Sequence, residues 1–150
     1  MHNYWMKKSR SNSVVVLVLF LAIPPKVFSE DSLVIEDAWI RATPPGVSTA
    51  AGYMTIGNES STDDKLIGAS TDRAKKVKLH MTMMENDTAK MHDQDTVEIK
   101  SGSEVQFEPG GLHLMLMGLT GSLKEGETVS VSLTFQQAGE LIVDMPVLRD

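Results

Sequence analysis

Apolar and polar positions alternate in short runs from Leu33 onward, and turn residues separate each run from the next. The clearest run is Thr128–Phe135, in which valine, leucine and phenylalanine alternate with small hydroxyl residues. This alternation is typical of a strand with one buried and one solvated face. No long segment has apolar residues at helical spacing, and no internal repeat is present. The pattern predicts an all-β domain with strands at Leu33–Arg41, Ala50–Asn58, Lys65–Ala69, Lys75–Met84, Ala89–His92, Val97–Lys100, Glu104–Phe107, His113–Gly118, Thr128–Gln136 and Glu140–Val147.

Turn signals lie between these segments at close intervals, as expected for a β-sandwich. They are Thr43–Gly46, Glu59–Ser61, Glu85–Asp87, Pro109–Gly111, Lys124–Gly126 and Ala138–Gly139. The turn at Glu85–Asp87 predicts a hairpin over Val77–Met91, which brings His80 and Met91 to neighbouring positions. Gly110 and Gly111 are expected to permit a tight turn before His113. No linker divides the chain after residue 30, so we expect one domain.

The first 29 residues have the order of a secretory signal peptide. Lys7, Lys8 and Arg10 precede an apolar run from Ser13 to Ile23. This run is too short for a helix that spans a bilayer, which needs roughly 20 apolar residues. We expect cleavage after Ser29, which leaves residues 30–150 as the exported domain and places it in the periplasm.

The charge of the exported part argues against nucleic acid as a partner. The whole chain has a net charge of −6, from 14 basic and 20 acidic residues. Four of the basic residues and none of the acidic ones lie in residues 1–29, so the remainder carries −10. Cysteine is absent, so no disulfide cross-links the domain and no thiolate can bind a metal.

Methionine is the soft donor that remains, and its distribution is uneven. The chain has 10 methionines, and six of them fall between positions 81 and 117: Met81, Met83, Met84, Met91, Met115 and Met117. His80 and His113 lie in the same stretch. Thioether sulfur is neutral and polarisable, so it suits Cu(I) but adds little for Zn²⁺, Mg²⁺ or Ca²⁺. Two imidazoles with two thioethers therefore favour Cu(I).

Strand geometry supports part of such a site. In the segment His113–Met117 the alternation places His113, Met115 and Met117 on one face of a strand. Leu114 and Leu116 then face the core. The spacing His80-x10-Met91-x21-His113-x-Met115 arises by chance in about 0.0005 of chains of this composition, so coincidence is a poor explanation.

This spacing and its surroundings resemble the periplasmic copper chaperone family PCu(A)C. The resemblance extends to Asp37–Gly46, Ala51–Met54, Pro109–Leu119 and Leu123–Gly126, and so to most of the chain after residue 30. It implies a cupredoxin-like, immunoglobulin-like Greek-key β-sandwich. It also implies that His80, Met91, His113 and Met115 are the ligands of one Cu(I) ion. The implied role is delivery of copper to cytochrome c oxidase subunit II, with a Sco-type protein as a further partner.

Several other residues stay outside the predicted site. Met81, Met83 and Met84 can supplement a ligand or fill the core, and Met117 is assigned to the rim or to packing. His92 is assigned to the surface. The aromatic pair Trp39 and Tyr53, with Arg41, is expected to pack on the core, with partner docking as the alternative.

Four other functions compete with copper delivery. A periplasmic copper scavenger or storage protein shares the same site, and the sequence does not separate it from a chaperone. An electron-transfer cupredoxin normally needs a cysteine thiolate, which is missing here. A structural adhesion module gives no reason for methionines near two histidines. An enzyme is not expected, because no nucleophile is paired with a base and four protein ligands leave no position for a substrate.

Overall fold

The computed structural model describes residues 33–149, and the predicted signal segment 1–29 lies outside them. All secondary structure in this part of the chain is β-strand. The strands are β1 (Leu33–Arg41), β2 (Thr49–Asn58), β3 (Asp64–Ser70), β4 (Ala74–Glu85), β5 (Thr88–Gln94), β6 (Val97–Ile99), β7 (Glu104–Phe107), β8 (Leu112–Leu119), β9 (Thr128–Phe135) and β10 (Gly139–Leu148). Each predicted strand is present, with ends that differ by two residues at most. Within these residues no helix of membrane-spanning length and hydrophobicity is found.

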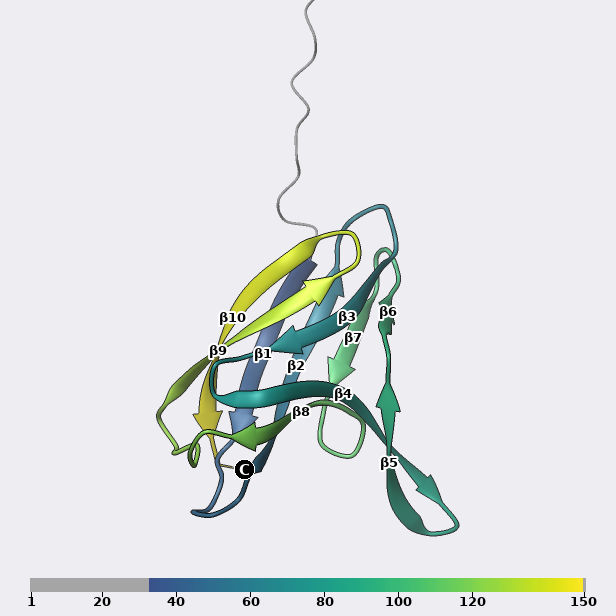
Figure 1. Ribbon diagram of the computed structural model, residues 1–150. Helices are drawn as coiled ribbons and strands as arrows, with labels where there is room; N and C mark the ends of the chain where they lie inside the picture. Colours follow the sequence, from purple (N-terminus) through teal and green to yellow (C-terminus); the bar gives the residue numbers. More distant parts are fainter. Residues whose placement is uncertain (1–32, 150) are drawn as a thin grey trace, which may run out of the picture.

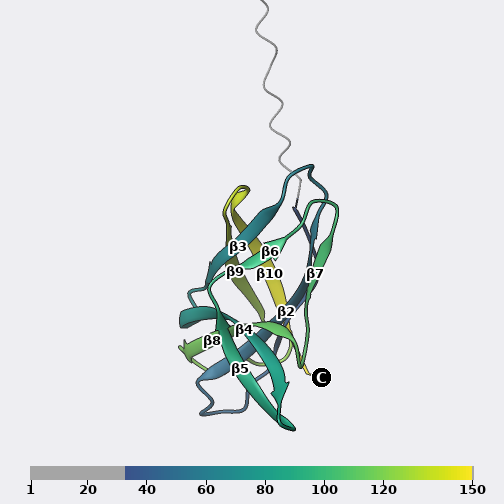
Figure 2. The same cartoon turned by 90° about the vertical axis from the view of Figure 1, so that its right-hand side faces the viewer.

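The strands form one continuous hydrogen-bonded order, β5-β4-β8-β7-β2-β1-β10-β9-β3-β6. The strands are arranged in two layers, one of β5, β4, β8, β7, β2 and β1 and the other of β10, β9, β3 and β6. The two layers are joined by strand pairing only where the ends of β1 and β10 pair, at Ile40–Val147 and Arg41–Leu148. Figure 1 shows β3, β9 and β10 in front of β1 and β2, and Figure 2 shows the same layers from the side. The prediction of a single all-β sandwich domain is confirmed.

The core lies between the two layers and is made by the alternating apolar positions. In β9, Val129, Val131 and Leu133 are almost fully buried, as the alternation predicts. Leu114 and Leu116 of β8 are also fully buried, so the opposite face of β8 is turned away from the core. The sandwich thus fixes the direction in which the functional side chains of β8 point.

The β4–β5 hairpin extends beyond the sandwich, at the lower edge of Figure 1. Its turn consists of Asn86 and Asp87, which have φ of 49° and 60° and connect the paired residues Glu85 and Thr88. Two central residues with positive φ match a type I′ turn, whose twist suits a tight antiparallel hairpin. The predicted hairpin is confirmed.

Candidate metal centre

Three adjacent strands, β5, β4 and β8, bring the four predicted ligands onto one face. His80 of β4 is the register partner of His113 of β8. Met115 is paired with Lys78, two residues before His80, and Met91 is paired with Thr82, two residues after it. Side chains alternate along a strand, so these pairings place all four candidate ligands on the same face.

The two histidines are in direct contact. Their ring centroids are 5.6 Å apart, and the rings meet edge to face at 81°. His80 is 8% exposed and His113 is 4% exposed, although histidine is a polar residue. Two adjacent buried imidazoles have four ring nitrogens that need partners. The hydrogen bonds of each ring therefore decide which nitrogens are available to bind a metal ion.

One ring nitrogen of His113 is held by the backbone. Its Nδ1 lies 3.1 Å from the carbonyl oxygen of Gly111, which can only accept, so Nδ1 donates. Nε2 then carries the lone pair, as in a histidine that binds a metal. The Gly111 oxygen also accepts the Thr82 N–H at 3.1 Å. Gly110, with φ of +83°, permits the tight turn that presents this carbonyl.

His80 has no hydrogen-bond partner at either ring nitrogen, and both nitrogens are buried. Asp93 Oδ1 lies 2.9 Å from Nε2, but the contact lacks the alignment of a hydrogen bond. Burial lowers the pKa of His80, and the attraction of Asp93 opposes this only in part. A neutral imidazole with an unpartnered buried nitrogen fits a metal ligand, because a bound ion compensates for the missing hydrogen bond.

Asp93 was missed by the sequence analysis. It follows Met91 by two residues in β5 and is the register partner of His80. It accepts a hydrogen bond from Lys78 Nζ, and this bond lowers the pKa of the Asp93 carboxyl. The signal was available in principle, since a residue two positions from Met91 on a strand lies on the same face.

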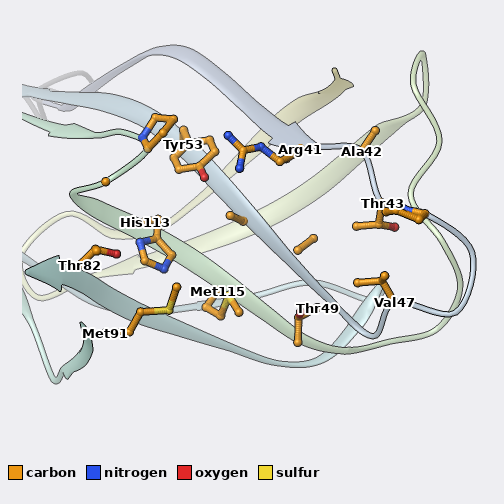
Figure 3. A pocket seen from close by; sticks show the side chains of 15 residues that line it. Arg41, Ala42, Thr43, Val47, Thr49, Tyr53, Thr82, Met91, His113 and Met115 are labelled. Atoms are coloured by element: carbon orange, nitrogen blue, oxygen red, sulfur yellow. The ribbon is translucent and has the colours of Figure 1, made fainter. Parts of the chain in front are cut away.

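The methionines occupy the open side of the site. Met91 is 60% exposed, whereas Met115 is half-buried. A pocket of about 470 Å³ is lined by Met91, His113 and Met115 together with Arg41 and Tyr53. Figure 3 shows the Met91, His113 and Met115 side chains gathered at one end of this pocket. The pocket is therefore lined by one of the two buried histidines, His113, and by both methionines, whereas His80 is not part of its lining.

The donor set restricts which metal the site can hold. Among residues 33–149, no three His, Cys, Asp or Glu side chains gather in a metal-binding cluster. Hard and borderline divalent cations favour such clusters. Two imidazoles and two thioethers instead suit a soft d¹⁰ ion such as Cu(I).

The remaining candidate residues take different positions. His92 and Met83 lie on the other face of the hairpin, where His92 Nε2 is 2.9 Å from Glu85 Oε1. Tyr53 is buried and its ring centroid is 4.8 Å from that of Trp39, so the two rings pack on each other. The prediction that they pack on the core is wrong, because neither belongs to the core cluster, which takes the neighbouring residues Ile40 and Met54 instead. The Arg41 guanidinium carbon is 5.6 Å from the Tyr53 ring centroid.

Comparison with known proteins identifies the family. The model of the family described as "Putative lipoprotein LpqE-like" matches residues 33–147. This chain belongs to the LpqE-like family. A relative from Leifsonia xyli subsp. xyli, named "Putative lipoprotein Lxx21020", is 32% identical over 118 residues. These residues are 78% of this chain and 70% of the relative.

Solved structures similar to this LpqE-like chain include copper-bound proteins. The copper-bound PCuAC domain from PmoF2 has a TM-score of 0.69 and 27% identity, covering 80% of this chain and 95% of that domain. The Cu(I) form of DR1885 from Deinococcus radiodurans has a TM-score of 0.60 and 34% identity, covering 78% of each chain. The predicted resemblance to the PCu(A)C family and its fold is confirmed.

Proposed function

We propose that this LpqE-like protein binds one Cu(I) ion through His80, Met91, His113 and Met115. The observation that carries the proposal is the direct pairing of two buried histidines, one of which has ring nitrogens without a hydrogen-bond partner, on the same face as two methionines. The copper-bound PCuAC domain and Cu(I)-bound DR1885 support copper as the ion. In this proposal copper is cargo and the chain catalyses no reaction.

The unequal exposure of the ligands favours transfer over permanent retention. Met91 is 60% exposed and lies on β5, the outermost strand at this end of the sheet. Thioethers are weak, neutral donors, so an incoming thiolate or imidazole can replace Met91 before the buried histidines release the ion. We therefore propose delivery of copper, with cytochrome c oxidase subunit II as recipient and a Sco-type protein as a further partner.

Export to the periplasm belongs to the same proposal. The lipoprotein description of the family supports passage across the cytoplasmic membrane. A site without cysteine also suits an oxidising compartment, because methionine forms no disulfide. Protein recovered from the periplasmic fraction with its N-terminus near Glu30 is the expected outcome.

The binding proposal is tested by anaerobic titration of the purified protein with Cu(I) against a chromophoric chelator. We expect one tightly bound ion, and at least about tenfold weaker binding in His113→Ala and in Met115→Leu. Met117→Leu is the matched control, because Met117 lies two residues further along β8 and is outside the proposed ligand set. Binding that is indifferent to His113 and Met115 would contradict the proposal.

A second experiment separates delivery from storage. Copper-loaded protein is mixed with the metal-free, reduced copper domain of oxidase subunit II, and the two are separated and assayed for copper. Transfer to the oxidase domain supports delivery. Retention by the loaded protein, with the titration unchanged, would favour the scavenger or storage function instead.

A further inference from the structure

The β4–β5 hairpin carries a second group of soft donors on its other face. Met81 of β4 is the register partner of His92 of β5, and Met83 is the partner of Lys90. Side chains alternate, so Met81, Met83 and His92 all lie on the face opposite His80 and Met91. Nothing in the first site uses these three side chains.

The spacing allows the three donors to meet. Directly opposed residues of an antiparallel pair have Cβ atoms about 5 Å apart, and diagonal neighbours lie about 7–8 Å apart. Met81 and His92 are directly opposed, and Met83 is diagonal to His92. Methionine side chains are long and flexible, so two thioethers and one imidazole can reach a common point between them.

His92 is prepared for such a role by Glu85. Its Nε2 is 2.9 Å from Glu85 Oε1, and the other oxygen of Glu85 accepts a hydrogen bond from Lys90 at 2.7 Å. Like the contact of His80 with Asp93, this contact is an ion pair without the alignment of a hydrogen bond, so it holds the imidazole beside an anchored carboxylate but does not by itself fix which ring nitrogen carries the proton. Histidines that bind metals usually have a carboxylate in this position.

Core packing does not account for Met83. It is 53% exposed and lies outside the core cluster, and the His92 side chain is 43% exposed. Met81 is half-buried and is paired on its other side with Leu112, which fixes one end of the group.

We propose that Met81, Met83 and His92 form a second Cu(I) site on the opposite face of the hairpin from the first. Three neutral donors without thiolate favour Cu(I) over divalent ions. With three donors in place of four and greater exposure, this site binds more weakly and exchanges faster than the first. It is suited to take up copper at the tip of the hairpin that also carries Met91. The inference concerns binding alone and does not depend on the recipient.

The test uses Cu(I) as the probe and a His113→Ala/Met115→Ala protein, which lacks the first site. Anaerobic titration is followed by the NMR signals of the methionine methyl groups and the histidine rings. We expect one bound Cu(I), at least about tenfold weaker than the tight ion of the wild type, with shifts at Met81, Met83 and His92. Adding Met83→Leu or His92→Ala is expected to abolish this binding.

Met84→Leu is the matched control, because Met84 is 69% exposed on the same strand but faces the other way. It is expected to retain the weak ion. No binding in the double variant, or binding that persists in both Met83→Leu and His92→Ala, would overturn the second site. The first site is judged separately, by loss of the tight ion from otherwise wild-type protein carrying His113→Ala.

Discussion

His80 shows how a single residue is placed for binding at a cost to stability. Both of its ring nitrogens are buried without a hydrogen-bond partner. An unpartnered buried polar group destabilises a folded protein by about 1–3 kcal/mol. The metal-free protein bears this cost, and an ion bound as proposed removes it, so His80 favours the copper-loaded state over the empty one.

Replacing His80 by leucine is expected to stabilise the metal-free protein at pH 7 by about 1 kcal/mol while weakening Cu(I) binding. The pH dependence is expected to change as well. Burial lowers the pKa of His80, so below its usual value of about 6.5 the unfolded chain takes up a proton that the folded chain resists. Wild-type stability therefore falls from pH 7 to pH 5, and thermal unfolding of His80→Leu shows a smaller fall.

Met117→Leu is the control for this pH dependence, because it replaces a side chain that does not titrate. It is expected to follow the wild type. An equal fall in stability for wild type and His80→Leu would show that other groups cause the pH dependence.

Strands and the β4–β5 turn were the elements most accessible to prediction. Their ends follow from alternation and from turn residues, which are local signals. The pairing of His80 with His113 was not predictable in the same way, because it depends on which strands become neighbours across 32 intervening residues. Alternation within β8 did predict that His113 and Met115 share a face, whereas the hydrogen bond from His113 to Gly111 depends on the turn geometry.

The type I′ turn at Asn86 and Asp87 gives a prediction for the hairpin as a unit. Asp87 has φ of 60°, which glycine adopts without strain and a β-branched residue resists. Asp87→Gly is expected to stabilise the protein by about 0.5 kcal/mol, and Asp87→Val to destabilise it by about 1–2 kcal/mol. Denaturant unfolding measures both effects.

Asp87→Val is also expected to weaken Cu(I) binding, because a distorted turn displaces Met91 relative to Thr82. If Asp87→Val leaves both the free energy of unfolding and the Cu(I) affinity unchanged, this turn neither stabilises the hairpin nor positions Met91. Asp87→Gly serves as the matched variant at the same position.

At the scale of the whole molecule, the site is assembled from parts that are distant in sequence. The pocket beside it includes Arg41, Val47 and Tyr53 from the β1–β2 region as well as Met91 and His113. Composition and spacing indicated the candidate ligands, but not this wall of the pocket, since it depends on the packing of β2 beside β8. The sequence therefore predicted which residues share one face of the sheet, but not the pocket beside them.

Binding of Cu(I) is expected to stabilise the entire domain, because the proposed ligands come from three neighbouring strands of one sheet. Free Cu(I) buffered at about one hundred times the dissociation constant adds about 2.7 kcal/mol, or a rise in Tm of roughly 10 °C. Anaerobic calorimetry measures the shift. Met91→Leu is expected to show a smaller shift than the control Met117→Leu, and equal shifts would exclude Met91 as a ligand.

The two edge strands, β5 and β6, affect whether copies of the protein associate through their sheets. An exposed strand edge is a template for pairing with a second chain. At one end β6 has only three residues, and at the other β5 carries Lys90 and Asp93 beside the exposed Met91. Short edges and charged edges both oppose such pairing. The protein can thus expose Met91, a proposed copper ligand, at the edge of the sheet while opposing edge-to-edge association through its own strands.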